Sequence, residues 1–195
     1  MKTFKQTVIN IHGAGPKHYR SLEDGSGDWQ AQLPTHLGSD YKVLSPQMPS
    51  PKNPSFEEWK ILFEKYLLRA RGDLIFVGHS LGGSFLLKYI SENIIPQKIL
   101  ALLLVATPFK TIKGFEAPTD YTSLKKIQNI FLYHSMDDVE VPYAHALMYN
   151  ELMQGNLKTY FNQGHFFKRK EFPDIIQDIH HIASSVSQNT ENTHI

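Results

Sequence analysis

The chain has 195 residues, of which 41% are hydrophobic and 12% aromatic, enough for one globular domain with a substantial core. Twenty basic and nineteen acidic side chains give a net charge of +1, so charge does not favour nucleic acid or an anionic membrane as a partner. The absence of cysteine excludes disulfides, thiolate metal sites and a cysteine nucleophile. No apolar run approaches the ~20 residues of a membrane span, and the N-terminal apolar run is too short for a signal peptide, so we expect a cytoplasmic protein.

Apolar runs of strand length alternate with longer amphipathic stretches, which is typical of a parallel sheet covered by helices on both faces. The expected strands, in chain order, are residues 6–12, 41–45, 74–78, 99–106, 129–134 and 157–161. The expected helices are residues 29–37, 56–70, 81–92, 142–153 and 172–186, and "SFEE" predicts a capping box in which Ser55 begins the second. The prediction is an α/β fold with a three-layer, doubly wound, six-stranded and mainly parallel sheet. Residues 1–187 form one domain, and residues 188–195 a polar, flexible tail.

Two glycine clusters follow predicted strands. "GAGPKH" lacks both the third glycine of a dinucleotide fingerprint and the Ser or Thr of a P-loop, so phosphate binding is not supported. "GHSLGG" matches G-x-S-x-G between a strand and a helix, the setting of a nucleophile elbow with Ser80 at its tip and the small residues Gly78 and Gly82 on either side. The pattern also arises by chance in roughly one chain in twenty of this length, so Ser80 needs partners elsewhere.

A serine nucleophile needs a histidine base and an acid that orients it, and both belong in loops after strands. His165 in "NQGHFF" fits the base, and "HSMDDVEVP" offers Asp137 or Asp138 as the acid. We expect a structural role for His12, a side chain directed away from Ser80 for His79, and a half-buried position for His134. The adjacent His180 and His181 are a weak metal candidate because they face different sides of a helix.

The segments "VINIHGAG", "SFEEW", "FVGHSLGG", "ATPF", "SMDDVEVPY" and "GHF", in this order, resemble the small serine hydrolases of the α/β-hydrolase superfamily typified by retinoblastoma-binding protein nine. The resemblance implies a minimal α/β-hydrolase fold without a separate lid domain. It assigns the acid to Asp138, and the oxyanion-binding N–H groups to Ala14 and Leu81. A retinoblastoma-type partner is not supported, because its L-x-C-x-E motif requires a cysteine that this chain lacks.

The expected function is hydrolysis of a small ester, thioester or amide through a Ser80–His165–Asp138 triad, with no metal and no cofactor. Aromatic side chains of the segment 107–126, of the base loop and of the loop after the first strand, residues 16–29, would shape the substrate pocket: Phe109, Phe115, Tyr121 and Phe166. Two alternatives stay open. One is an interaction protein on a hydrolase scaffold, and the other is a peptidase or acyl transferase that uses the same triad.

Overall fold

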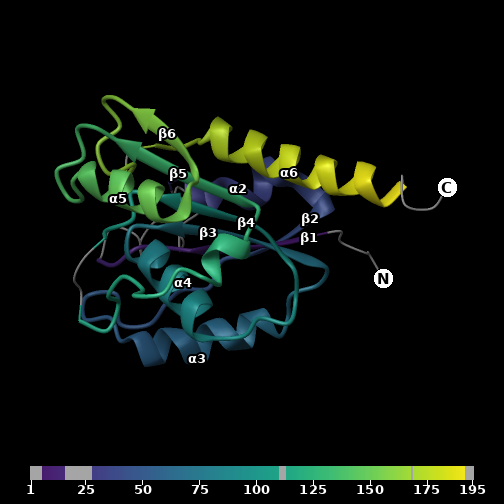
Figure 1. The fold of residues 1–195 in the computed structure, drawn as a ribbon, viewed down its shortest axis with the longest axis horizontal. Coiled ribbons are helices and arrows are strands. Elements are labelled where there is room, and N and C mark those ends of the chain that lie inside the picture. Colours follow the sequence, from purple (N-terminus) through teal and green to yellow (C-terminus); the bar gives the residue numbers. More distant parts are fainter. Residues whose placement is uncertain (1–5, 16–27, 110–112, 168, 192–195) are drawn as a thin grey trace.

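In the computed structural model, which describes residues 6–15, 28–109, 113–167 and 169–191, six parallel strands form one central sheet (Figure 1). The strand order is β2-β1-β3-β4-β5-β6, so the chain starts near the middle and winds toward both edges. All five neighbouring pairs are parallel. The strands are β1 (Gln6–Ile11), β2 (Tyr41–Leu44), β3 (Asp73–His79), β4 (Ile99–Val105), β5 (Asn129–Ser135) and β6 (Asn156–Tyr160).

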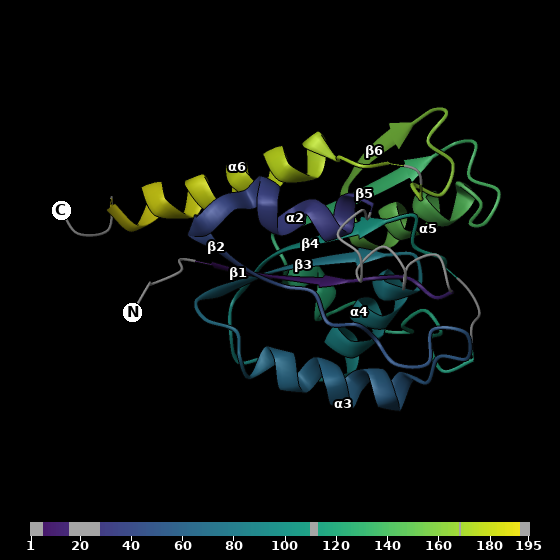
Figure 2. The ribbon, with the colours of Figure 1, turned by 180° about the vertical axis from the view of Figure 1, so that it is seen from behind.

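Helices cover both faces of the sheet, which confirms the predicted three-layer, doubly wound α/β fold. Figures 1 and 2 show α2 and α6 on one face, while α3 and α4 lie on the other. The helices are α2 (Trp29–Leu37), α3 (Phe56–Leu67), α4 (Leu81–Glu92), α5 (Ala144–Met153) and α6 (Pro173–Glu191). Two short 3-10 turns, Gly38–Asp40 and Leu124–Lys126, precede β2 and β5.

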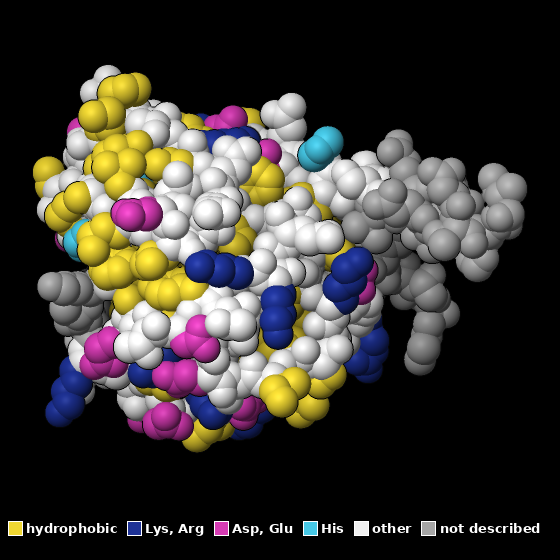
Figure 3. Space-filling view, in the orientation of Figure 1, with side chains coloured by type: hydrophobic (Ala, Val, Ile, Leu, Met, Phe, Trp, Pro, Cys, Tyr) yellow, Lys and Arg dark blue, Asp and Glu magenta, His cyan; other side chains and the backbone are white. Residues whose placement is uncertain are grey.

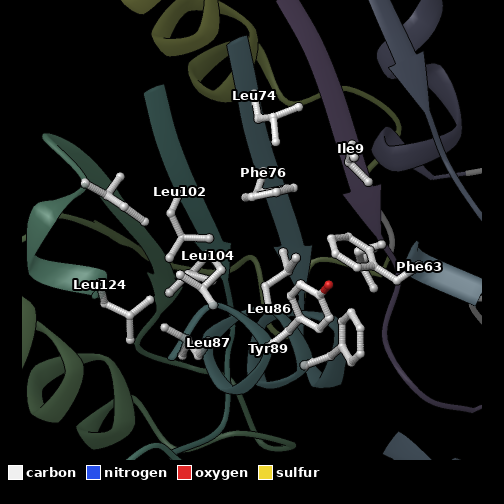
Figure 4. Close-up of a cluster of buried hydrophobic side chains, with 14 of the residues drawn as sticks. Ile9, Phe63, Leu74, Phe76, Leu86, Leu87, Tyr89, Leu102, Leu104 and Leu124 are labelled. Carbon is white, nitrogen blue, oxygen red and sulfur yellow. The ribbon is translucent and has the colours of Figure 1, made fainter. Parts of the chain in front are cut away.

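The core consists of two clusters of buried side chains, one on each face of the sheet. The larger cluster packs α3, α4 and α5 against the sheet, and Figure 4 shows Phe63, Leu86 and Tyr89 facing the strand residues Phe76 and Leu104. The second cluster packs α2 and α6 against the other face. The strands β3 and β4 contribute to both clusters, which explains why their sequences are almost continuously apolar.

Several element ends differ from the prediction. Helix α3 ends at Leu67, three residues early, and the N–H groups of Arg69 and Ala70 close a tighter turn after it. Ser55 is its N-cap residue, but its side chain makes no capping hydrogen bond, so the predicted capping box does not form. Helix α6 reaches Glu191 and includes four residues of the predicted tail, while residues 192–195 lie outside the described part of the chain.

The parallel register brings the carboxyl ends of the strands together. Ile11 of β1 lies opposite Gly78 of β3, and the ends of β4, β5 and β6 continue the same edge. Large hydrophobic side chains stay exposed around β5, α5 and β6, at the left of Figure 3. They are Met136, Val139, Leu147, Met148 and Phe161. The loops that follow β5 and β6 therefore present apolar surface at the edge where a site is expected.

Candidate active site

Ser80 forms a sharp turn between β3 and α4. Its backbone angles are φ 52° and ψ −123°, a conformation that non-glycine residues rarely adopt. Its N–H donates to the carbonyl of Val105 at 2.8 Å, and its own carbonyl accepts from the Gly83 N–H at 2.9 Å. The turn is thus held from both sides, and the half-buried Ser80 lies at the first turn of α4. These features are those of the predicted nucleophile elbow.

The two flanking glycines are required by close backbone contacts. A Cβ atom on Gly82 would lie 2.2 Å from the carbonyl oxygen of Ile11 and 2.6 Å from that of His12. A Cβ on Gly78 would lie 2.7 Å from the Cα of Gly83. Because backbone atoms cannot move aside as a flexible side chain can, both positions need glycine. The contact at Gly82 also places the elbow directly against the end of β1.

The loop after β1 is fixed by His12. The Met48 N–H donates to His12 Nε2 at 2.8 Å, so Nε2 is an acceptor, and Nδ1 carries the proton that is donated to the Gly13 carbonyl at 2.6 Å. Burial lowers the pKa of His12, which keeps the ring neutral near neutral pH. The expected structural role of His12 is thereby confirmed. Ala14 follows in this loop, half-buried against the larger core cluster.

His165 and Asp138 form a buried pair. His165 Nδ1 lies 2.8 Å from Asp138 Oδ2, and since a carboxylate can only accept, Nδ1 carries the proton. The neutral ring then presents Nε2 as its basic nitrogen. Asp138 Oδ1 accepts the N–H groups of Glu140 at 2.9 Å and Val141 at 3.0 Å, which fixes the carboxylate within its own turn. Among the described residues, Ser80 makes no hydrogen bond to His165.

The carboxylate of Asp138 is kept ionised by its partners. Burial alone would raise its pKa, but the hydrogen bonds from His165 and from the Val141 N–H outweigh burial and hold the pKa of Asp138 below its usual value. Asp137 has a different role at the surface. It accepts the Ser135 hydroxyl and the Gly164 N–H, so it ties the acid loop to the base loop.

The sequence matches the family of serine hydrolases over residues 19–181, most of the chain. The chain belongs to the serine hydrolase family. A comparison with curated proteins finds no match. The serine hydrolase is also similar to solved structures at low identity. For the ydeN gene product of B. subtilis, the TM-score is 0.79 at 19% identity, with 92% of this chain and 99% of that chain covered.

Two further structures show the same fold. A hydrolase of the alpha/beta superfamily from Xanthomonas campestris gives a TM-score of 0.61 at 16% identity, with 94% of this chain and 99% of that chain covered. An esterase domain from Rhodothermus marinus gives a TM-score of 0.60 at 13% identity, with 94% of this chain and 85% of that chain covered. The serine hydrolase therefore has the minimal α/β-hydrolase fold.

His79 has a contact that sequence reasoning missed. Its side chain does not bond to Ser80, as expected, and instead its Nε2 donates to the carbonyl oxygen of His165 at 2.9 Å. The ring centroids of His79 and His165 lie 4.9 Å apart. Trp29 and Phe167 pack edge-on against the His79 ring. His79 therefore joins the elbow to the base loop. No local pattern could reveal this bond, because its two residues are 86 positions apart.

Three of the four predicted pocket residues are buried in the core of the structure. Phe115 packs edge-on against Phe56 and Trp59 in the larger core cluster, and Tyr121 is buried in the same cluster with its hydroxyl inside. Phe166 stacks on Phe172 on the opposite face of the sheet. These side chains serve as core, because burial leaves them no surface for a substrate.

Phe109 is half-buried against the Tyr149 ring and stays a candidate for the pocket. Residues 16–27 of the loop after β1 and residues 110–112 of the segment 107–126 lie outside the described part of the chain.

Within the described residues, no group of three potential metal ligands occurs, and no helix is long and apolar enough to cross a membrane. The ring of His180 is engaged by the Tyr41 hydroxyl, at 3.1 Å from Nδ1.

Proposed function

We propose that this serine hydrolase cleaves a small carboxylic ester, thioester or amide through an acyl-enzyme on Ser80. The observation that carries the proposal is the buried hydrogen bond from His165 Nδ1 to Asp138 Oδ2, at 2.8 Å. That bond leaves Nε2 of His165 as a base, on a loop that is hydrogen-bonded to His79, the residue before Ser80. An ionised, buried acid, an oriented base and a strained serine are the parts that acyl transfer requires.

In the proposed mechanism, Ser80 Oγ attacks the substrate carbonyl while His165 Nε2 takes the hydroxyl proton. The protonated His165 then gives that proton to the leaving alcohol, thiol or amine, and the acyl group stays on Ser80. Water, activated by the same nitrogen, releases the acid and restores the serine. In this mechanism the hydrogen bond between Ser80 and His165 forms when substrate is bound, as catalytic hydrogen bonds often do.

The oxyanion of the tetrahedral intermediate would be held by two backbone N–H groups, those of Leu81 and Ala14. Leu81 is the first residue of α4, where N–H groups have no partner within the helix and the helix dipole favours negative charge. Ala14 belongs to the loop that the Gly82 contact places beside the elbow. Each such donor contributes roughly 100- to 1000-fold in rate.

A fluorophosphonate probe tests the proposal directly, because it reacts only with an activated serine. We expect covalent labelling of the wild type, none in Ser80→Ala, and a sharp reduction in His165→Ala. The exposed His36, replaced by alanine, is the control that should label like the wild type. Absence of labelling in well-folded wild type would contradict catalysis and favour an interaction protein on the hydrolase scaffold.

The substrate class is then resolved with p-nitrophenyl esters of increasing chain length, run beside aminoacyl amides. We expect hydrolysis of short esters, with the acyl preference altered by Phe109→Ala because that ring is the half-buried candidate of the pocket. Turnover of the amides alone would instead assign the triad to a peptidase.

A further inference from the structure

His134 is a buried titratable group that the mechanism above does not use. It is the penultimate residue of β5 and is only 1% exposed, so it is more deeply buried than its sequence position suggests. Its Nε2 lies 2.9 Å from the carbonyl oxygen of Val141 and 3.5 Å from Asp138 Oδ2. A second histidine therefore contacts the same carboxylate oxygen that orients His165.

The proton on this ring can be placed by its partner. A carbonyl oxygen can only accept, so His134 Nε2 carries the proton that it donates to Val141. Nε2 also lies 3.5 Å from Asp138 Oδ2, so the polar N–H group is close to the carboxylate charge. Burial lowers the pKa of His134, against the opposing effects of Val141 and Asp138, so the ring stays neutral near neutral pH.

His134, Val141 and Asp138 together close the acid turn. The Val141 carbonyl accepts from His134, while the Val141 N–H donates to Asp138 Oδ1. Asp138 Oδ1 is thus held by two backbone N–H groups, and Oδ2 is shared by His165 at 2.8 Å and His134 at 3.5 Å. The carboxylate therefore accepts three hydrogen bonds, from Glu140, Val141 and His165, and His134 adds a longer contact from the preceding strand.

We propose that His134 is a positioning residue of the acid–base pair: its Nε2–H fixes the turn that carries Asp138 through the Val141 carbonyl, and its ring beside Oδ2 offsets part of the carboxylate charge. The inference rests on the proposed function for its effect on catalysis. Because the carboxylate attracts the proton on His165, the polar N–H group 3.5 Å from Oδ2 weakens that attraction. His134 thereby keeps His165 a base that releases its proton to the leaving group.

Other groups near the ring do not supply this effect. The ionisable groups that act on His134 are Asp138, His165 and His145 of α5, and the Tyr143 ring packs edge-on at 5.9 Å. On the opposite face of β5, Tyr133 donates to Asp178 and takes no part in the acid turn. This neighbour provides a matched control, since it can be changed within the same strand without touching Asp138.

The test is an NMR titration of the full chain with isotope-labelled histidine rings, in which the His165 signal is assigned from His165→Ala. In His134→Phe we expect His165 to take up its proton at a pH higher by about half a unit, since the lost contact is weaker than a full hydrogen bond to a charge. His134→Gln has an amide N–H that can take the place of the imidazole N–H. In this variant the His165 midpoint should return most of the way to the wild-type value. Tyr133→Phe should lower stability without moving the titration.

An unchanged or lowered titration midpoint for His165 in His134→Phe would overturn the proposal, because a side chain that merely fills the core leaves the base as it was. If the phenylalanine variant does not fold, His134→Asn, whose shorter amide does not reach the Nε2 position, gives the same comparison. The titration needs no turnover, so it separates this inference from the proposed function. If probe labelling fails while the titration shifts, the proposed function is wrong and the role of His134 on Asp138 stands.

Discussion

Asp137 and Asp138 are adjacent in sequence but differ in their surroundings. Asp138 is buried, with its two oxygens divided between backbone N–H groups and His165. Asp137 is exposed and binds the Ser135 hydroxyl and the Gly164 N–H, which lowers its pKa. The first is placed to act on the base, and the second to hold the loop that carries it.

This difference predicts unequal effects of the same substitution. Asp138→Asn should lower kcat/KM for an ester by roughly 10³- to 10⁴-fold, because an amide does not stabilise the imidazolium or fix the correct tautomer. Asp137→Asn keeps an oxygen for the Gly164 N–H and should cost less than about tenfold, the value of one exposed hydrogen bond. Rates from both variants, at matched folded fractions by circular dichroism, check the assignment. A larger loss at Asp137 would show that the acid is assigned to the wrong residue.

For single residues, the sequence predicted features built from adjacent residues better than the tertiary environment of a side chain. The elbow at Ser80 and its glycines follow from a short pattern, because the turn is built from adjacent residues. Residue patterns alone left Asp137 and Asp138 open, and the choice required the family resemblance. Residue patterns could not show that Phe115 and Phe166 are buried in the core clusters, because an aromatic side chain suits a pocket and a core equally well.

Helix α6 is attached to the sheet by polar contacts as well as apolar ones. The Lys158 ammonium of β6 lies 2.6 Å from Asp178, and the Tyr133 hydroxyl of β5 donates to the same carboxylate at 2.6 Å. Burial, followed by this hydrogen bond to a carboxylate, raises the pKa of Tyr133 far above its usual value, so it stays a donor. Asp178 therefore connects α6 to two neighbouring strands.

Removing the charge of Asp178 should loosen this helix. Asp178→Asn leaves Lys158 without its ionic partner in a partly buried position, and we expect a loss of about 1 to 2 kcal/mol in the free energy of unfolding. The control is Glu92→Gln, which removes the exposed partner of Lys88 on α4 and should cost less than about 0.5 kcal/mol. Urea denaturation gives both values. Equal losses in the two variants would mean that the contact at Asp178 contributes no more than a surface pair.

Element types could be predicted from the sequence, whereas some ends could not. Helix α4 has the predicted bounds because it starts at the elbow and its apolar positions continue to Ile90, two residues before its end at Glu92. Helix α6 extends five residues beyond the predicted end at Val186, since polar residues that break the apolar pattern do not forbid helical backbone. At Ser55 the N-cap position was right and the side-chain hydrogen bond was not, because a pattern does not fix a rotamer.

For the whole molecule, buried titratable groups at the carboxyl ends of the strands make stability depend on pH. His12 and His134 are buried at the ends of β1 and β5, and burial lowers the pKa of both below the ordinary value of 6.5. The unfolded chain therefore binds protons at these positions before the folded chain does. Their contribution to stability is complete above pH 6.5 and is lost as the pH falls below that value.

Asp138 gives a second, more acidic step. Its pKa in the folded protein lies below the ordinary value of 3.8, so its contribution is present above that pH and is lost as the pH falls through the folded value. As the pH falls, the free energy of unfolding should thus begin to decline at a higher pH than that at which the carboxylates take up protons. In a protein of this net charge without buried histidines, the free energy of unfolding would instead stay level down to about pH 4.

Urea unfolding across the pH range measures this dependence. Between about pH 6.5 and pH 5, we expect the free energy of unfolding to fall with a slope that approaches about 1.4 kcal/mol per pH unit for each buried histidine. His134→Phe should remove the contribution of His134 and reduce the slope, whereas replacing the exposed His36 with glutamine should leave it unchanged. A level profile in the wild type down to about pH 4 would contradict the burial of neutral imidazoles at these two strand ends. If His36→Gln changed the slope as much as His134→Phe, the dependence would belong to surface charge rather than to the strand ends that hold the site.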